Sequence, residues 1–151
     1  MKLSTFSDYS LRVLIYLGLH PERLATVAEI TAAFGISRGH LMKVVHQLGK
    51  AGYLETVRGK GGGIRLGQAS EQIVLGRVIR HTEGDISLVE CFSTGSDCRI
   101  QPACRLKAIL AEALAGMFLV LDSYTLADLL QQPQALEALI GCESQVTVSA
   151  G

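Results

Sequence analysis

Two helical segments, separated by a glycine and followed by a glycine-rich hairpin, limit the folds open to this chain more than any other feature. Thr26 precedes the apolar segment 27–34, and Glu29 three residues later completes the capping-box pattern of a helix start. Gly35 can end this helix because glycine adopts positive φ angles without a steric cost. Ser37 starts a second helix, whose apolar residues recur at i, i+3, i+4 and i+7: Leu41, Val44, Val45 and Leu48. This pattern predicts a helix-turn-helix.

A β-hairpin is predicted directly after the second helix, which ends near Gly52. Residues 53–57 and 64–66 are the expected strands, and the turn between them reads Arg-Gly-Lys-Gly-Gly-Gly. A hairpin in this place is a wing. The predicted fold class is therefore mainly α with a small β-hairpin wing: a winged helix-turn-helix domain plus the long dimerisation helix discussed below. The turn lacks the Gly-Lys-Ser/Thr ending of a P-loop and no helix follows at once, so we exclude nucleotide binding.

The charges of the chain are segregated although the net charge is zero. Residues 1–66 contain nine Lys or Arg and four acids, whereas residues 67–151 contain five basic and ten acidic residues. A basic half is expected where a surface meets phosphate, with a chance imbalance of exposed charges as the alternative. Within this half, the glycine-rich turn and the polar face of the second helix are the places where a phosphate backbone can be approached closely.

Contact with double-stranded operator DNA is therefore expected at two groups of residues. The second helix presents polar side chains opposite its apolar stripe, for contact with bases or phosphates: Ser37, Arg38, His40, Lys43 and Gln47. His40 could equally be a surface histidine that makes no contact. In the wing, Arg58, Lys60 and Arg65 should mainly neutralise the charge of the DNA backbone.

Three of the four cysteines, Cys91, Cys98 and Cys104, lie within fourteen residues. Thiolates suit iron–sulfur clusters and zinc far better than hard cations. A zinc knuckle would show Cys pairs two to four residues apart, which these wider gaps argue against. One coordination position is left to be filled from elsewhere. The alternatives are a disulfide, which a reducing cytosol disfavours, or thiols that are merely reactive or structural.

Neither a membrane protein nor an enzyme is expected. No apolar run reaches the eighteen or more residues of a membrane span. Asp8 and Arg12 interrupt the apolar N-terminal stretch, and no small-residue cleavage site follows it, so we expect a cytoplasmic protein. The four histidines are scattered, and no nucleophile has an evident base and orienting group.

The remaining segments predict further helices. Ser7 is expected to cap a first helix that ends at His20-Pro21, and residues 72–81 are expected to form another. The longest helix should run from about Cys104 to Leu121, with an apolar seam of Leu106, Leu110, Ala113, Met117, Val120 and Tyr124. The seam suits packing against a second copy of the chain, giving a homodimer, with an intramolecular core helix as the alternative. A cap at Thr125 and a helix over 134–140 complete the chain.

These segments give four expected regions. They are a winged helix-turn-helix DNA-binding domain (1–81), a cluster-binding loop region (82–104), a dimerisation helix (105–130) and a C-terminal tail (131–151).

A winged helix, a three-cysteine loop and a long dimerisation helix in this order resemble the bacterial iron–sulfur winged-helix regulators. The resemblance covers about residues 1–130, including the opening Ser-Asp-Tyr-Ser-Leu-Arg-Val-Leu, the wing turn, the cysteine loop and Tyr-Thr-Leu-Ala-Asp. It implies a homodimeric transcriptional repressor. One branch of the family carries a histidine ligand three residues after the last cysteine, where this chain has Lys107. The chain is more similar to the nitric-oxide-sensing branch, whose cluster is expected to be 4Fe-4S rather than 2Fe-2S.

The same resemblance implies that Asp8 of one subunit is the fourth ligand of the cluster held by the cysteines of the other. Asp8 also has an ordinary role as an acid in the first turn of a helix, and Cys142 is a rival ligand that is more simply a bystander. Two alternative functions stay open. One is a regulator that senses iron, cluster supply or redox state through a two-iron centre, and the other is an iron–sulfur electron-transfer protein.

Overall fold

The structure, a computed structural model of the chain, describes residues 2–142, except for the side chain of Cys142. Helices dominate the fold, and the two strands form one antiparallel hairpin. The elements are α1 (Thr5–Leu19), α2 (Val27–Phe34), α3 (Arg38–Lys50), β1 (Leu54–Val57), β2 (Gly63–Leu66), the 3₁₀ turn η1 (Ser70–Gln72), α4 (Leu75–Glu83), the 3₁₀ turn η2 (Glu90–Phe92), α5 (Leu106–Asp122), α6 (Leu126–Leu129) and α7 (Pro133–Cys142).

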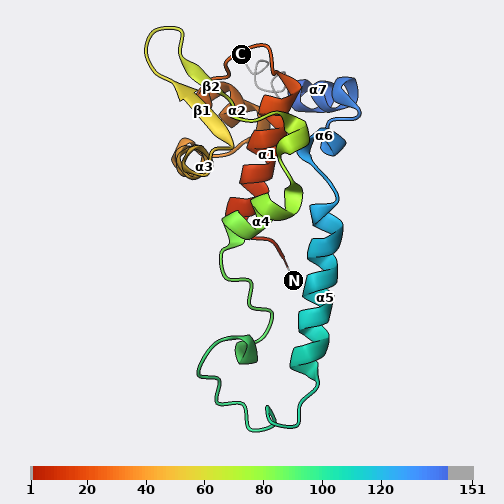
Figure 1. Cartoon of the computed structure of the whole chain (residues 1–151). Coiled ribbons are helices and arrows are strands. Elements are labelled where there is room, and N and C mark those ends of the chain that lie inside the picture. Colours follow the sequence, from red (N-terminus) through yellow and green to blue (C-terminus); the bar gives the residue numbers. More distant parts are fainter. Residues whose placement is uncertain (1, 143–151) are drawn as a thin grey trace, which may run out of the picture.

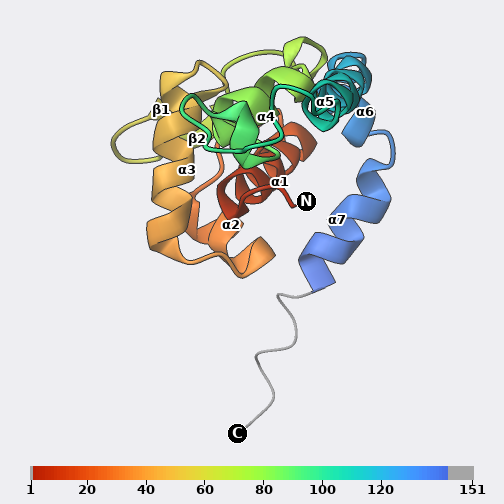
Figure 2. The same cartoon turned by 90° about the horizontal axis from the view of Figure 1, so that it is seen from below.

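The elements from α1 to α4 form what we call the winged-helix unit, with α1 at its centre. Figure 2 shows α1 surrounded by α2, α3 and α4. Val13, Leu14 and Leu17 of α1 are buried in one apolar core together with the stripe of α3 and with Leu54 and Ile64 of the hairpin. The predicted fold class, mainly α with a small hairpin wing, is confirmed.

Local sequence signals account for the turn of the helix-turn-helix. The Thr26 side chain accepts a hydrogen bond from the Glu29 amide, and the Glu29 carboxylate accepts one from the Thr26 amide, so the predicted capping box is confirmed. Gly35 ends α2 with a left-handed φ of 63°, which glycine adopts most readily. The Ser37 hydroxyl accepts a hydrogen bond from the His40 amide and starts α3, as predicted. All four residues of the predicted apolar stripe are buried.

Two helix predictions were wrong in detail because tertiary contacts decide them. Ser4, not Ser7, caps α1, and its hydroxyl accepts a hydrogen bond from the Ser7 amide at 3.1 Å. The buried Ser7 hydroxyl instead lies 2.7 Å from that of Thr82 on α4. The segment predicted as a helix over 72–81 is broken at Ile73 and Val74, because the backbone of residues 73–75 pairs with residues 124–126.

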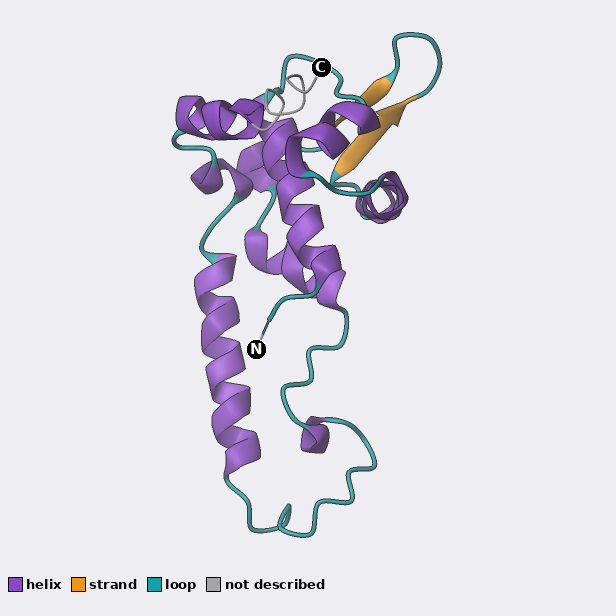
Figure 3. Cartoon of the chain, turned by 180° about the vertical axis from the view of Figure 1, so that it is seen from behind, coloured by secondary structure: helices purple, strands orange, loops and turns teal. Residues whose placement is uncertain are grey.

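The rest of the chain extends away from the winged-helix unit as an arm, formed by the cysteine loop (residues 84–105) and α5. Figure 1 shows the loop descending from α4, turning at the far end and returning through α5. Figure 3 shows the same arrangement from behind, with the loop largely irregular. α6 and α7 then lie back against the unit. Among residues 2–142, no helix combines the length and the apolar character needed to cross a bilayer.

Candidate functional site

The outer face of α3 is a polar surface held in place by the buried inner face. Leu41, Val44 and Leu48 are almost completely buried, which fixes the rotation of the helix about its axis. All five polar residues predicted on the opposite face are exposed: Ser37, Arg38, His40, Lys43 and Gln47. The Ser37 hydroxyl lies 3.0 Å from Nδ1 of His40. Ser37 and His40 are therefore already engaged with each other at the start of α3.

Met42 is an exposed apolar residue on α3 that the sequence reasoning missed. Its side chain is 47% exposed. Together with Arg38 and Val57 it lines a groove of about 320 Å³ between α3 and the wing. The sequence prediction covers only polar residues of this helix, but position 42 also falls outside the buried stripe, and this spacing marks it as exposed. The groove adds an apolar surface to an otherwise polar face.

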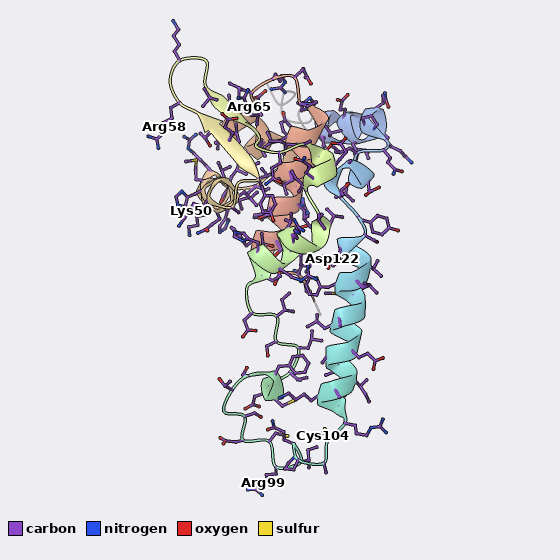
Figure 4. All side chains as sticks on the ribbon, in the orientation of Figure 1. Lys50, Arg58, Arg65, Arg99, Cys104 and Asp122 are labelled. Atoms are coloured by element: carbon purple, nitrogen blue, oxygen red, sulfur yellow. The ribbon has the colours of Figure 1, made fainter. Side chains whose placement is uncertain are left out.

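The wing presents its basic residues in two different states. Arg65 pairs with Glu55 opposite it in the hairpin, with Nε and Oε2 2.9 Å apart. This hydrogen bond lowers the pKa of Glu55, so the pair stays ionised and Arg65 is locally neutralised. Arg58 and Lys60 are exposed, and no ion pair engages them within residues 2–142. Figure 4 shows Arg58 projecting from the wing on the side of α3. Gly59 and Gly61, with φ of 100° and 76°, form the turn that carries Lys60.

The cysteine loop lies at the far end of the arm, where Figure 4 labels Cys104 and Arg99. Cys98 is exposed, Cys91 and Cys104 are half-buried, and none of the three forms a disulfide. The structure does not bring them together: in the described part of the chain, no three His, Cys, Asp or Glu side chains form a metal-binding group. Three free thiols on an irregular surface loop are nevertheless a donor set that fits a soft metal centre. Cys142, the rival ligand, has its side chain outside the described residues.

Asp8 lies in the first turn of α1, as predicted, and within residues 2–142 it forms no metal-binding group with two cysteines of its own chain. Its carboxylate pairs with Arg12 at 3.1 Å, and both side chains are about half exposed. The guanidinium of Arg12 also lies over the ring of Phe34, 5.9 Å from its centroid. Asp8 is thus a surface carboxylate with a positioned cationic partner.

The outward face of α5 is apolar and uncovered. Of the predicted seam, Leu106, Val120 and Tyr124 are exposed by half or more, and Leu110 and Met117 are partly buried. Phe118 is the residue of this helix that is buried. Two residues missing from the predicted seam lie on the exposed side: Ile109, 54% exposed, and Gly116, which would leave open space for an added side chain. The uncovered face is therefore centred slightly to one side of the predicted seam.

A winged helix with an exposed polar helix face and an appended arm defines the class of helix-turn-helix transcriptional regulators. The chain belongs to the Rrf2 family: the family model, described as "Iron-dependent Transcriptional regulator", matches residues 3–132. The family consists of regulators, so the protein is a transcriptional regulator and not an enzyme.

Curated relatives and solved structures agree with this assignment. The chain is 49% identical to the HTH-type transcriptional regulator NsrR of Geobacillus kaustophilus and 48% identical to that of Bacillus subtilis, in both cases over 93% of this chain and 97% of the relative. The structure of T. potens IscR resembles it with a TM-score of 0.70 and 29% identity, covering 91% of this chain and 90% of that one. The structure of CymR, the global cysteine regulator of B. subtilis, gives a TM-score of 0.62 and 32% identity, covering 85% and 95%.

Proposed function

We propose that this protein is a homodimeric DNA-binding repressor that senses nitric oxide through an iron–sulfur cluster. The observation that carries the proposal is the set of three free cysteines on one loop, at the end of an arm joined to a winged-helix unit. Identity of nearly one half to regulators named NsrR, over almost the whole chain, supports the same function.

The winged-helix unit supports the DNA-binding part of the proposal. In a dimer, two copies of α3 enter successive major grooves, with half-sites about 34 Å apart or a multiple of that distance. Arg38, Lys43 and Gln47 are exposed where they can reach bases or phosphates, and His40 lies beside them. Arg58 and Lys60 in the wing neutralise the DNA backbone. Arg65 contributes less because Glu55 already balances its charge.

The outward face of α5 supports the homodimer. A helix that leaves Leu106, Ile109 and Val120 in water has an apolar face that a second copy can cover. Gly116 and Ala113 lie among these residues and let another helix approach closely. The same face on both copies meets itself about a two-fold axis, which is the usual symmetry of a dimer.

Cys91, Cys98 and Cys104 are the proposed cluster ligands, with Asp8 of the partner chain as the fourth. When bound, a cluster of the four-iron type supplies iron that nitric oxide attacks, with loss of protein ligands. Asp8 stands at the start of α1, the central helix of the unit, so its ligation ties one winged-helix unit to the loop of the other chain. In the structure Arg12 holds this carboxylate. Arg12 therefore competes with the cluster for the Asp8 carboxylate, and it stabilises this carboxylate once the cluster is lost. The two α3 helices then lose their fixed separation.

The test is an anaerobic preparation whose iron, sulfide and absorbance are measured, followed by titration with nitric oxide while operator binding is recorded. Cys98→Ala should remove the cluster absorbance and weaken operator binding about tenfold or more, because the tie is lost. Cys142→Ala is the matched control and should keep both. Tight, specific binding by a colourless Cys98→Ala variant would contradict the coupling, and iron-free protein that represses normally would contradict the whole proposal.

A second candidate keeps the regulator and changes the signal to iron supply or redox state. The family description as iron-dependent and the likeness to an IscR structure favour it. Lys107, in place of a histidine ligand, disfavours it. Release of the operator on iron chelation or oxygen exposure, with no response to stoichiometric nitric oxide, would decide for this candidate. The electron-transfer alternative instead predicts reversible reduction without any salt-sensitive DNA binding.

A further inference from the structure

α5 is fastened to the winged-helix unit at two places. The first is a backbone attachment: the Leu75 amide donates to the Tyr124 carbonyl at 3.0 Å, and the Leu126 amide donates to the Ile73 carbonyl at 2.8 Å. The second is an ion pair between Arg80 of α4 and Asp122 of α5; Figure 4 labels Asp122. Because the backbone attachment lies at the start of α4 and the end of α5, it acts as a pivot. The ion pair, more than one helical turn further along α4, then fixes the angle between the two helices.

The Arg80–Asp122 ion pair has a geometry that no other ion pair within residues 2–142 has. Nη1 and Nη2 of Arg80 donate to Oδ1 and Oδ2 of Asp122, both at 2.7 Å, in a bidentate pair. Its guanidinium also lies 4.1 Å from the ring centroid of Phe118, the buried residue of α5. Gly76 leaves the space that the Asp122 carboxylate occupies, since a Cβ there would collide with it. A planar cation that is both paired and stacked holds its partner helix in one orientation, which a lysine cannot do.

The cysteine loop and this joint line one surface depression. Phe92, the residue after Cys91, lines a cavity of about 400 Å³ together with Arg80, Phe118 and Asp122. A change in the position of Cys91 therefore alters one wall of the depression in which the ion pair lies.

The other end of α4 is bonded to the start of α1. The Ser4 amide donates to the Glu83 carboxylate at 2.7 Å, and the Ser7 and Thr82 hydroxyls lie 2.7 Å apart. Burial raises the pKa of Glu83, but hydrogen bonds from Ser7 and Ser4 outweigh it and lower the pKa, so the acceptor stays charged at neutral pH. The residues that cap α1 are thus positioned by α4, which Arg80 positions against α5.

We propose that Arg80 is a positioning residue that transmits the state of the cysteine loop to the winged-helix unit of its own chain. This route runs within one subunit, from Phe92 through Arg80 and α4 to the start of α1, and is separate from the proposed ligation by Asp8 across the dimer. The inference rests on the proposed function, because it concerns how loss of the cluster changes DNA binding.

The experiment measures operator affinity with the cluster loaded and removed, in the wild type and in Arg80→Gln, Arg80→Lys and Asp122→Asn. Wild-type affinity should fall on cluster removal, and in all three variants this ratio should shrink by about fivefold or more. Cluster content and absorbance should stay as in the wild type. The double variant Arg80→Gln/Asp122→Asn should lose no more than Arg80→Gln alone, because the ion pair is already absent in that variant. Glu71→Gln removes an exposed charge of the winged-helix unit that forms no ion pair in residues 2–142, and as the control it should keep the wild-type ratio.

A readout that does not involve DNA separates coupling from simple destabilisation. Amide hydrogen exchange at the start of α1 should quicken in the wild type when the cluster is removed. In Arg80→Gln it should be fast already in the loaded protein. If the variants melt earlier but keep both the affinity ratio and the wild-type exchange pattern, Arg80 is merely structural and the inference is wrong. If the operator affinity of the wild type does not depend on the cluster at all, the proposed function is wrong, whatever the variants show.

Discussion

The winged-helix unit and the arm bury their apolar residues in opposite ways. In the unit, α1, α3 and the hairpin place apolar residues in one shared core, where Leu14 and Leu41 have no exposed surface. In the arm, a 17-residue helix buries Phe118 and leaves Leu119 and Val120 exposed by 75% and 58%. An apolar surface of this extent on one helix is typical of an interaction site. The unit is complete within one chain, whereas the arm presents the face that the proposed dimer would cover.

The sharpest test of this difference is to shorten a leucine in each region. Leu14→Ala should lower the free energy of unfolding by about 2–5 kcal/mol, because it opens a cavity in a packed core. At concentrations low enough to keep the protein monomeric, Leu119→Ala should change it by roughly 0.5 kcal/mol or less, since within one chain its side chain is mostly in water. Denaturant unfolding followed by circular dichroism measures both. Equal losses for the two variants would mean that the arm is packed as firmly as the unit.

A charge on the uncovered face of α5 should separate the subunits without unfolding them. Val120→Glu is expected to weaken the dimer about tenfold or more, because a carboxylate would be buried against an apolar partner. Sedimentation measures the monomer–dimer equilibrium, and circular dichroism checks that the helices persist. Ala108→Glu places the same charge on an exposed flank of α5, about 120° around the helix from Val120, and should leave the dimer intact. A Val120→Glu protein that dimerises as well as this control would exclude the outward face as the interface.

The smallest expected effect concerns the groove between α3 and the wing, which is already formed in one chain. Met42→Ala should weaken operator binding by about 1 kcal/mol, roughly the contribution of one buried methylene or methyl contact. We expect the contact to be a thymine methyl group, the apolar feature of the major groove. Operator DNA with deoxyuridine in place of thymine in the half-sites should bind the wild type more weakly and the variant no differently. If both proteins respond equally to deoxyuridine, Met42 does not contact the methyl groups.

The sequence predicted best those features that adjacent residues determine. The capping box at Thr26, the left-handed Gly35 and the buried stripe of α3 each depend on residues a few positions apart, and all three were predicted correctly. The cap of α1 was misassigned because two serines, Ser4 and Ser7, offer the same hydroxyl. The choice between them depends on Thr82, 75 residues from Ser7. The break at Ile73 depends in the same way on pairing with residues 124–126.

The features of the candidate site also differ in whether nearby or distant residues determine them. The exposed residues of α3 and the wing follow from helix and hairpin periodicity, so their positions could be predicted from the sequence. That Arg65 is neutralised by Glu55 follows only from the strand register, and the Arg80–Asp122 pair spans 42 residues. The ligand role of Asp8 comes from the family resemblance alone and stays a prediction, since the structure pairs this carboxylate with Arg12.

The length of α5 has a consequence for how such proteins diversify. Seventeen residues rise about 25 Å, so the cysteine loop lies well outside the core that stabilises the DNA-contacting surface. Substitutions, insertions or deletions in the loop leave that core intact. Under the proposed function, the sensing loop and the DNA-contacting surface are therefore stabilised by separate parts of the chain.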